Sequence, residues 1–163
     1  MQNGSWLILI VGLPGTGKSF LACRLADLFK ASIVTTEVIR SQLLGDAVVD
    51  EDKDFTHDEL VLTYRVVNLI VDALLSGGQS VIVDGVFRSE EQRKSVFAIA
   101  KRHGVSVLGI QTVCSDTSAL ERLRHRKELG TVSPAGEITY AKLKDLFEPV
   151  GSEFIYVHTD APV

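Results

Sequence analysis

An octet from Gly12 to Ser19 reads G-x-x-x-x-G-K-S and constrains this chain more than any other feature. It follows an apolar run, Trp6 to Val11, and precedes a segment with apolar residues at helical spacing. A strand, this glycine-rich turn and a helix in that order are typical of a phosphate-binding loop. The glycines let consecutive backbone N–H groups turn toward a polyphosphate, and the helix N-terminus adds further donors. The octet therefore predicts a nucleoside triphosphate site.

Individual residues of the octet have separate predicted roles. The residues expected to bind the nucleotide are Gly12, Pro14, Gly15, Thr16, Gly17, Lys18 and Ser19. We expect Lys18 to reach the β- and γ-phosphates of ATP, and the Ser19 hydroxyl to bind Mg²⁺. A glycine-rich turn without a ligand is the alternative interpretation.

Composition limits the remaining possibilities. A chain of 163 residues, 45% hydrophobic and 23% charged, is typical of one globular domain, here residues 1–163. No segment approaches the ~20 apolar residues of a membrane span, so we expect no membrane contacts. The two cysteines without disulfide spacing lead us to expect a cytoplasmic protein. The net charge of −4 disfavours nucleic acid as a partner. Cys23 and Cys114 lack metal or disulfide spacing and are predicted to be buried free thiols.

Apolar periodicity predicts alternating strands and helices. Strands are expected at residues 6–11, 32–35, 81–83, 105–113 and 154–158. Helices are expected at residues 19–30, 37–44, 57–75, 89–103, 118–127 and 137–147. This alternation predicts a single three-layer α/β/α domain with a five-stranded parallel sheet. Residues 46–54, with the acidic run 50–52, and residues 128–136 are predicted loops, and a small lid is expected over about 122–137.

Serine and threonine caps mark the starts of three helices. Thr56 with Glu59, Ser89 with Gln92, and Ser118 with Glu121 each have the spacing of a capping box. We therefore expect these three pairs to begin the helices that follow them.

Two carboxylates lie where predicted strands end. Asp84 closes the third strand, and Glu37 lies in the first turn of the helix after the second strand. Since ligands bind at the carboxyl ends of parallel strands, both side chains could reach the octet. Asp84 is a candidate Mg²⁺ residue beside Ser19, or else the first residue of an Asp-Gly turn. Glu37 is a candidate base toward an acceptor hydroxyl, or else an acid that only interacts with the helix dipole.

A basic segment precedes the second predicted loop. Arg122 and Arg126 are four residues apart and share one helix face. They are candidate catalytic cations, brought over a transferring phosphoryl group when a lid closes. Arg124 and Lys127 lie in the same run, so an ordinary solvated basic face is the alternative.

Three further arginines are candidates for holding an acceptor. Arg40 lies one helical turn after Glu37, and Arg88 follows Asp84. Either could bind an anionic group of the acceptor, and Arg93 is a weaker candidate. Ordinary surface arginines are the alternative.

Together these residues resemble the small P-loop kinases of the adenylate-kinase-like branch. The resemblance is closest to zeta-toxin, gluconate-kinase and polynucleotide-kinase-like proteins and covers nearly the whole chain. The family loop GxPGxGKS matches residues 12–19, and the D-x-x-R signature is represented by residues 37–40 with Glu in place of Asp. The D-A-T/N-F signature is represented by residues 84–87 with Val86 at its polar position.

The second half of the chain extends the resemblance. The lid pattern E-R-x-x-x-R is represented by Glu121, Arg122 and Arg126, followed by residues 133–135 where the family often has Ser-Asp-Ala. Residues 147–149 match the F-E-P ending. The resemblance implies strand order 2-3-1-4-5. It also implies that residues 150–152, before the last strand, border the adenine.

The predicted function is ATP- and Mg²⁺-dependent transfer of the γ-phosphoryl group to a hydroxyl of a small-molecule acceptor, such as a sugar or sugar nucleotide. One alternative is a regulatory module that binds ATP with little transfer. A 5′-hydroxyl polynucleotide kinase is another, which the acidic charge disfavours. A toxin-like kinase would have an antitoxin partner. The sequence leaves the acceptor and the oligomeric state open.

Overall fold

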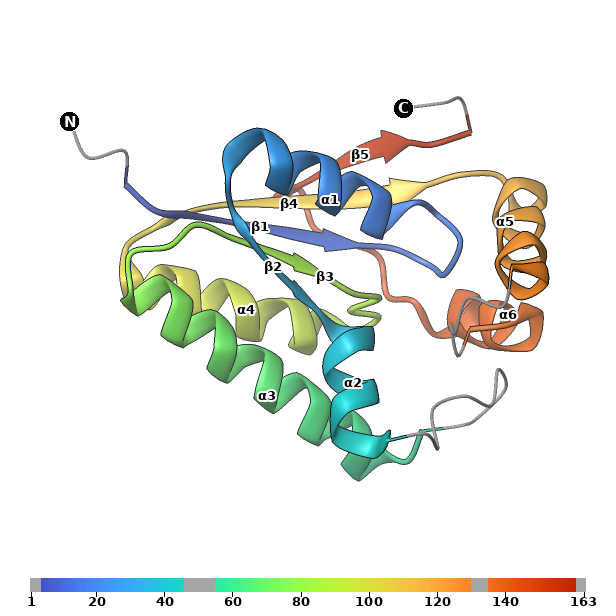
Figure 1. Cartoon of the computed structure of the whole chain (residues 1–163), viewed down its shortest axis with the longest axis horizontal. Helices are drawn as coiled ribbons and strands as arrows, with labels where there is room; N and C mark the ends of the chain where they lie inside the picture. The colour runs from blue at the N-terminus through green and yellow to red at the C-terminus, as the bar shows by residue number, and fades with distance from the viewer. Residues whose placement is uncertain (1–3, 46–54, 130–134, 161–163) are drawn as a thin grey trace.

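The computed structural model describes residues 4–45, 55–129 and 135–160. Its strands are β1 (Trp6–Val11), β2 (Ser32–Thr35), β3 (Val81–Asp84), β4 (Ser106–Val113) and β5 (Phe154–His158). They form one parallel sheet with the order β2-β3-β1-β4-β5 (Figure 1). This is the order that the resemblance implied, and the α/β fold class predicted from alternation is confirmed.

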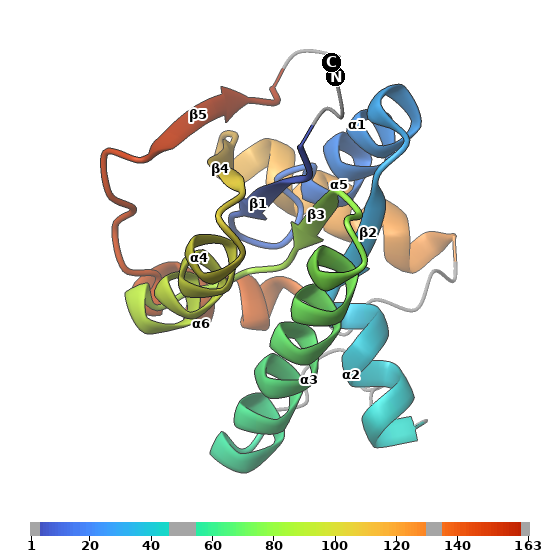
Figure 2. The same ribbon diagram turned by 90° about the vertical axis from the view of Figure 1, so that its left-hand side faces the viewer.

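Helices surround this sheet and its carboxyl edge. They are α1 (Lys18–Phe29), α2 (Thr36–Leu44), α3 (His57–Ser76), α4 (Glu90–His103), α5 (Asp116–Glu128) and α6 (Glu137–Leu146). Figure 2 shows α1 on one face of the sheet and α3 with α4 on the other. In Figure 1, α5 and α6 lie beyond the ends of the strands, next to the loop between β1 and α1. No helix in these described ranges is long and apolar enough to cross a membrane.

The two faces of β1 supply two separate hydrophobic clusters. Leu7 and Leu9 point toward α3 and α4, where they pack with Val67. Ile8 and Ile10 point the other way and pack against α1. Successive strand side chains alternate between faces, so a continuous apolar strand can bury both. β1 is therefore held between two layers, with its carboxyl end at the edge where the octet begins.

Most predicted element boundaries agree with the structure within one or two residues. The capping boxes at Thr56 with Glu59 and at Ser89 with Gln92 are both present. Each is formed within four consecutive residues, which is why local sequence was sufficient to predict them. Residues 46–54, including the acidic run 50–52, and residues 133–134 lie outside the described part of the chain.

Two local predictions are wrong. Both cysteines were expected to be buried, but Cys23 is exposed, since Ala22 and Ala26 occupy the buried positions of α1, and Cys114 is half-buried. α5 begins after Ser115, not Ser118, and the Ser115 side chain accepts a hydrogen bond from the Ser118 backbone. The Ser118 hydroxyl donates instead to Asp160, at 2.8 Å. This second bond could not be predicted from a local pattern, because Asp160 follows β5 and lies 42 residues away.

Candidate active site

The octet forms a tight loop between β1 and α1. Thr16 closes it, since its hydroxyl donates to the Leu13 carbonyl at 2.7 Å and bonds the Thr112 hydroxyl of β4 at 2.8 Å. Gly15 has φ 79° and presses against α5: a Cβ atom there would lie 2.6 Å from the Ala119 carbonyl oxygen. The loop thus requires glycine at this position both for its backbone conformation and for its contact with α5.

Replacing Gly15 by Ala is expected to lower the free energy of unfolding by about 2–4 kcal/mol, from left-handed backbone strain plus overpacking. Urea denaturation measures this change. Gly104→Ala is the matched control, because Gly104 also has positive φ but has open space around its α-carbon. Equal losses in the two variants would show that the contact with Ala119 contributes nothing.

Lys18 lies at the centre of the charged groups. Its Nζ donates to the Leu13 carbonyl at 2.9 Å, so the side chain folds across the loop. Burial, followed by the positive charge of Arg126, lowers the pKa of Lys18, whereas the charges of Asp84 and Glu37 oppose this change. Three of the predicted site residues are therefore close enough to affect the Lys18 ammonium.

Asp84 and Ser19 meet as a pair that fits a magnesium site. Asp84 is 2% exposed, and its Oδ2 accepts a hydrogen bond from the Ser19 hydroxyl at 2.6 Å. Its Oδ1 is buried and has no hydrogen-bond partner in the part of the chain that the structure describes. A buried acceptor of this kind suits a water molecule of a Mg²⁺ shell. The described residues hold no cluster of three or more His, Cys, Asp or Glu side chains that could bind a metal by themselves.

A cavity of about 190 Å³ opens at the carboxyl edge of the sheet. Its walls come from the phosphate-binding loop, the ends of β2 and β3, the first turns of α2 and α3, and one side of α6. Ten of the predicted site residues line it together: Lys18, Glu37, Arg40, Asp84, Arg88 and Arg126, with Pro14, Gly15, Gly17 and Ser19 of the loop. Glu37 is half-buried in the first turn of α2. The cavity is thus lined by the phosphate-binding loop, by the Asp84 carboxylate that fits a magnesium site, and by the second carboxylate, Glu37.

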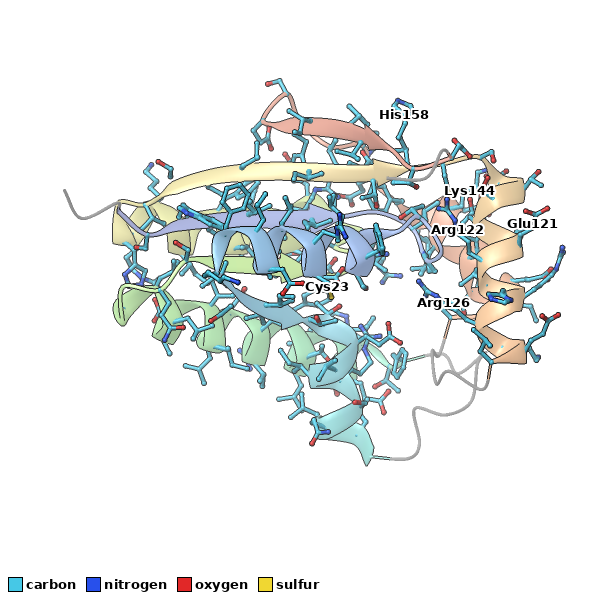
Figure 3. The ribbon with its side chains drawn as sticks, turned by 45° about the horizontal axis from the view of Figure 1, so that its top comes forward. Cys23, Glu121, Arg122, Arg126, Lys144 and His158 are labelled. Atoms are coloured by element: carbon cyan, nitrogen blue, oxygen red, sulfur yellow. The ribbon has the colours of Figure 1, made fainter. Side chains whose placement is uncertain are left out.

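The basic run on α5 divides into three different environments. Figure 3 shows Arg122 and Arg126 on the side of α5 nearest the sheet and Glu121 on the opposite side. Arg126 lines the cavity. Arg122 instead donates to the Gly15 carbonyl at 3.2 Å and to the side chain and backbone oxygens of Thr159. Arg124 pairs with Glu137 of α6 at 2.5 Å and is exposed. Of the two predicted lid cations, only Arg126 lines the cavity.

Thr159 is a residue of this region that the sequence analysis missed. It follows β5 and is 4% exposed. Its hydroxyl donates to the Thr16 carbonyl at 2.9 Å, and its N–H donates to the Val113 carbonyl at 2.9 Å. Val150, in the segment implied to border the adenine, is partly buried and packs against the hydrophobic cluster on the α3–α4 face. One feature of the sequence could have indicated Thr159. It directly follows a predicted parallel strand, and the carboxyl ends of these strands lie at the same edge of the sheet as the loop.

Comparison with known proteins assigns the family. The AAA_33 family, described as an AAA domain, matches residues 7–150. The chain belongs to this family. This assignment, with the five-stranded fold, confirms the resemblance to small P-loop kinases.

Individual relatives show how far the similarity extends. The chain is 29% identical over 74% of its length to 6-phosphofructo-2-kinase 1 of Saccharomyces cerevisiae, of which it spans 17%. It is 27% identical over 95% of its length to a protein of Aeropyrum pernix named "Probable adenylyl-sulfate kinase", of which it spans 84%. A solved sugar kinase from Janibacter sp. HTCC2649 has a TM-score of 0.77 at 16% identity, covering 97% of this chain and 87% of that one.

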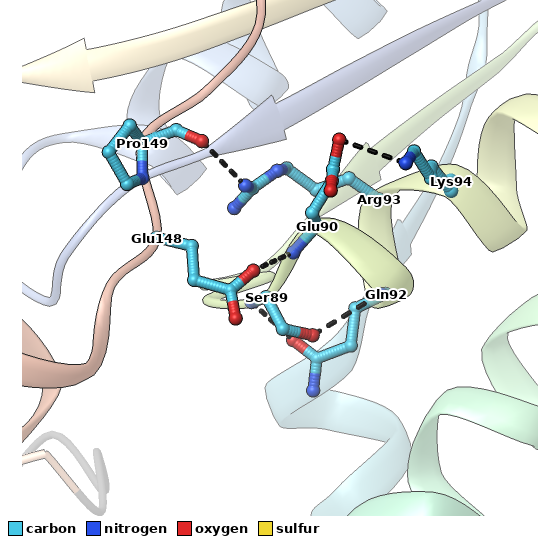
Figure 4. Close-up of polar contacts among 7 residues, drawn as sticks. All are labelled: Ser89, Glu90, Gln92, Arg93, Lys94, Glu148 and Pro149. Atoms are coloured by element: carbon cyan, nitrogen blue, oxygen red, sulfur yellow. Dashed lines mark hydrogen bonds and ion pairs between the residues drawn. The ribbon is translucent and has the colours of Figure 1, made fainter.

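Arg88 and Arg93 have different surroundings. Arg88 lines the cavity. Arg93, the weaker acceptor candidate, is 2% exposed and donates to the carbonyl of Phe87 at 2.8 Å. It also donates to the carbonyl of Pro149 at 2.9 Å (Figure 4). The Glu148 carboxylate accepts from the Glu90 backbone N–H in the same cluster. The F-E-P ending of the resemblance thus joins the segment after α6 to the loop after β3.

Replacing Arg93 by Met is expected to destabilise the protein by about 2–4 kcal/mol, because two carbonyls lose a charged donor while the side-chain volume is roughly kept. Chemical denaturation checks this expectation. Lys94→Met is the control on the same helix, since the Lys94 side chain is 70% exposed in its pair with Glu90. We expect about 0.5 kcal/mol or less from that surface change. A similarly small loss in Arg93→Met would remove the assigned role.

Proposed function

We propose that this protein transfers the γ-phosphoryl group of ATP to a hydroxyl group of a small-molecule acceptor. The observation that carries the proposal is the convergence of Lys18, Glu37, Asp84 and Arg126 on one cavity at the phosphate-binding loop. A protein that only binds nucleotide needs the loop and a metal residue. A second carboxylate lining the same space adds a group that can accept the proton of an acceptor hydroxyl.

In this proposal the loop and α1 hold the triphosphate. The Lys18 ammonium exchanges its bond to the Leu13 carbonyl for β- and γ-phosphate oxygens, and Arg126 lies over the group that is transferred. Ser19 and Asp84 would hold Mg²⁺, which neutralises charge on the phosphates when bound. Arg122 is assigned a positioning role, because its donors are directed to Gly15 and Thr159.

Glu37 is the proposed base for the acceptor hydroxyl. The acceptor oxygen forms a bond to the γ-phosphorus, the bond from that phosphorus to the β,γ-bridging oxygen breaks, and the hydroxyl proton passes to the Glu37 carboxylate. The products are a phosphate ester and ADP. The side chain of Glu is one methylene longer than the Asp of the related signature, so the acceptor oxygen would be held that much farther from α2.

ADP formation in the presence of Mg²⁺, ATP and a panel of hydroxyl compounds tests the function. The panel includes sugars, hydroxy acids, sugar phosphates, nucleotides and oligonucleotides with a 5′-hydroxyl. We expect one compound class to increase ADP formation, with a phosphorylated product detected by mass spectrometry and both signals abolished by EDTA. Tight ATP binding without turnover on any compound would instead identify a nucleotide-binding module. Transfer to oligonucleotides alone would identify a polynucleotide kinase.

A further inference from the structure

The capping box that begins α4 has a member that also lines the cavity. The Ser89 hydroxyl accepts a hydrogen bond from the Gln92 backbone N–H at 3.3 Å, and the Ser89 backbone N–H donates to Oε1 of the Gln92 side chain at 3.2 Å. Gln92 is half-buried and is one of the residues that line the cavity. Its side chain therefore serves the start of α4 and borders the proposed site of transfer at the same time.

The bond within the cap fixes how the Gln92 carboxamide is turned. A carboxamide has one oxygen, which accepts hydrogen bonds, and one NH₂ group, which donates them. Because the Ser89 N–H can only donate, Oε1 must face it and Nε2 must lie on the other side. Figure 4 shows Nε2 directed away from Ser89. Among the described residues, the side chain of Gln92 bonds only to Ser89, so the Nε2 donors are available to a ligand.

The capping box of α3 shows that a cap of this kind does not need an amide. There the same position is occupied by Glu59, whose carboxylate accepts from the Thr56 backbone N–H at 2.8 Å. Among the described residues that line the cavity, Glu59 is absent. Both boxes need an oxygen acceptor at this position, which Glu and Gln provide equally. Gln92 adds an uncharged donor, and its box is the one at the cavity.

Apolar side chains border the same part of the cavity. Leu60 and Val86, from the first turn of α3 and the loop that leads into α4, both line it and have no hydrogen-bonding side-chain group. A ligand oxygen that loses water in such surroundings needs a protein donor in exchange. A site that provides one donor therefore favours compounds with an oxygen at that place and rejects analogues that lack it.

We propose that Gln92 is a specificity-determining residue, and that its Nε2 donates to a second, uncharged oxygen of the acceptor. This oxygen is additional to the hydroxyl that would meet Glu37, so the acceptor is an alcohol with a further hydroxyl, ether or carbonyl group. The inference rests on the proposed function, because it assigns the acceptor to this cavity. The donor itself stands on the geometry of the cap.

Side-chain NMR tests the donor directly. The ¹⁵N-labelled protein is saturated with Mg²⁺ and AMPPNP, and the members of the same compound panel are added singly. The NH₂ signals of Gln92, assigned by their loss in Gln92→Met, should shift saturably with at least one of them. Gln79 is the control, since its side-chain oxygen also accepts a bond, from the Ser32 hydroxyl at the start of β2, away from the cavity. No shift at Gln92 with any compound, or an equal shift at Gln79, would overturn the proposal.

Deoxy analogues then test specificity. The compound that shifts Gln92 most is compared by calorimetry with analogues in which one oxygen at a time is replaced by hydrogen. We expect one analogue to bind the unmodified protein about tenfold more weakly than the parent compound, and Gln92→Met to bind both equally. Ser89→Ala is the matched control, because it removes one bond of the cap but keeps the backbone N–H that orients the amide, so it should retain the preference.

Gln92→Glu keeps the cap, as Glu59 does in α3, and identifies the oxygen. A hydroxyl can turn and donate to the new carboxylate, whereas an ether or carbonyl oxygen loses its bond. An undiminished preference in Gln92→Met would overturn the role of Gln92. A compound that shifts the Gln92 signals without any ADP formation would count against phosphoryl transfer instead, because the NMR signals report binding alone.

Discussion

Replacing Lys18 by Met should reduce acceptor-dependent ADP formation by about 10²–10³-fold, the loss typical when one preorganised cation or donor is removed from a developing charge. The Met side chain keeps most of the length and volume of Lys, so the fold should be retained. Initial rates at saturating ATP measure the loss. We expect unchanged circular dichroism and a melting temperature close to that of the unmodified protein.

Lys101→Met is the matched control for this change. Lys101 is an exposed residue in the last turn of α4, at the end of the helix away from the cavity. Its replacement should leave turnover unchanged. If Lys18→Met retained more than about a third of the rate, Lys18 would not stabilise the charge that develops during transfer.

Replacing Glu37 by Gln should lower turnover by about 10²–10⁴-fold while ATP affinity changes by no more than a few-fold. Gln keeps the shape of Glu but cannot accept the proton of the acceptor hydroxyl. Rates with a responsive acceptor, together with ATP binding by calorimetry, separate the two quantities.

Glu91→Gln distinguishes a base from a residue that only interacts with a helix dipole. Glu91 is also an acid in the first turn of a helix, α4, and it is exposed. A change there removes a comparable dipole interaction, worth about 0.5 kcal/mol, without touching the cavity. If both variants kept full turnover, Glu37 would be excluded as the base and its role would be that of a helix-terminal acid.

Local patterns in the sequence were sufficient to predict the strands, most helices and the phosphate-binding loop. The loop depends on glycine spacing within eight residues, and the caps at Thr56 and Ser89 depend on hydrogen bonds within four. Strand–helix alternation also predicted that the ends of β2 and β3 would share one edge. That edge is where Glu37 and Asp84 were expected to lie, and the structure places both in the cavity there.

Contacts between distant segments needed the folded chain. Helical periodicity placed Arg122 and Arg126 on one face of α5. Arg122 is held at the loop by a hydrogen bond to Thr159, which lies 37 residues later in the chain and packs against the loop. In the same way, Ser118 is bound by Asp160, and Arg93 by Phe87 and Pro149. Each of these arrangements depends on how β5 and α6 return to the sheet, which no short pattern specifies.

The amino-acid sequence by itself therefore determined that this protein folds as an α/β domain around a phosphate-binding loop. Short-range hydrogen bonds and apolar periodicity carry that information within a few residues. The tertiary structure decided which charged and which apolar side chains line the cavity. Beyond the phosphate-binding loop, the cavity is lined by residues of α2, α3, the loop after β3 and α6, so its chemistry exists only once the sheet has brought these segments together.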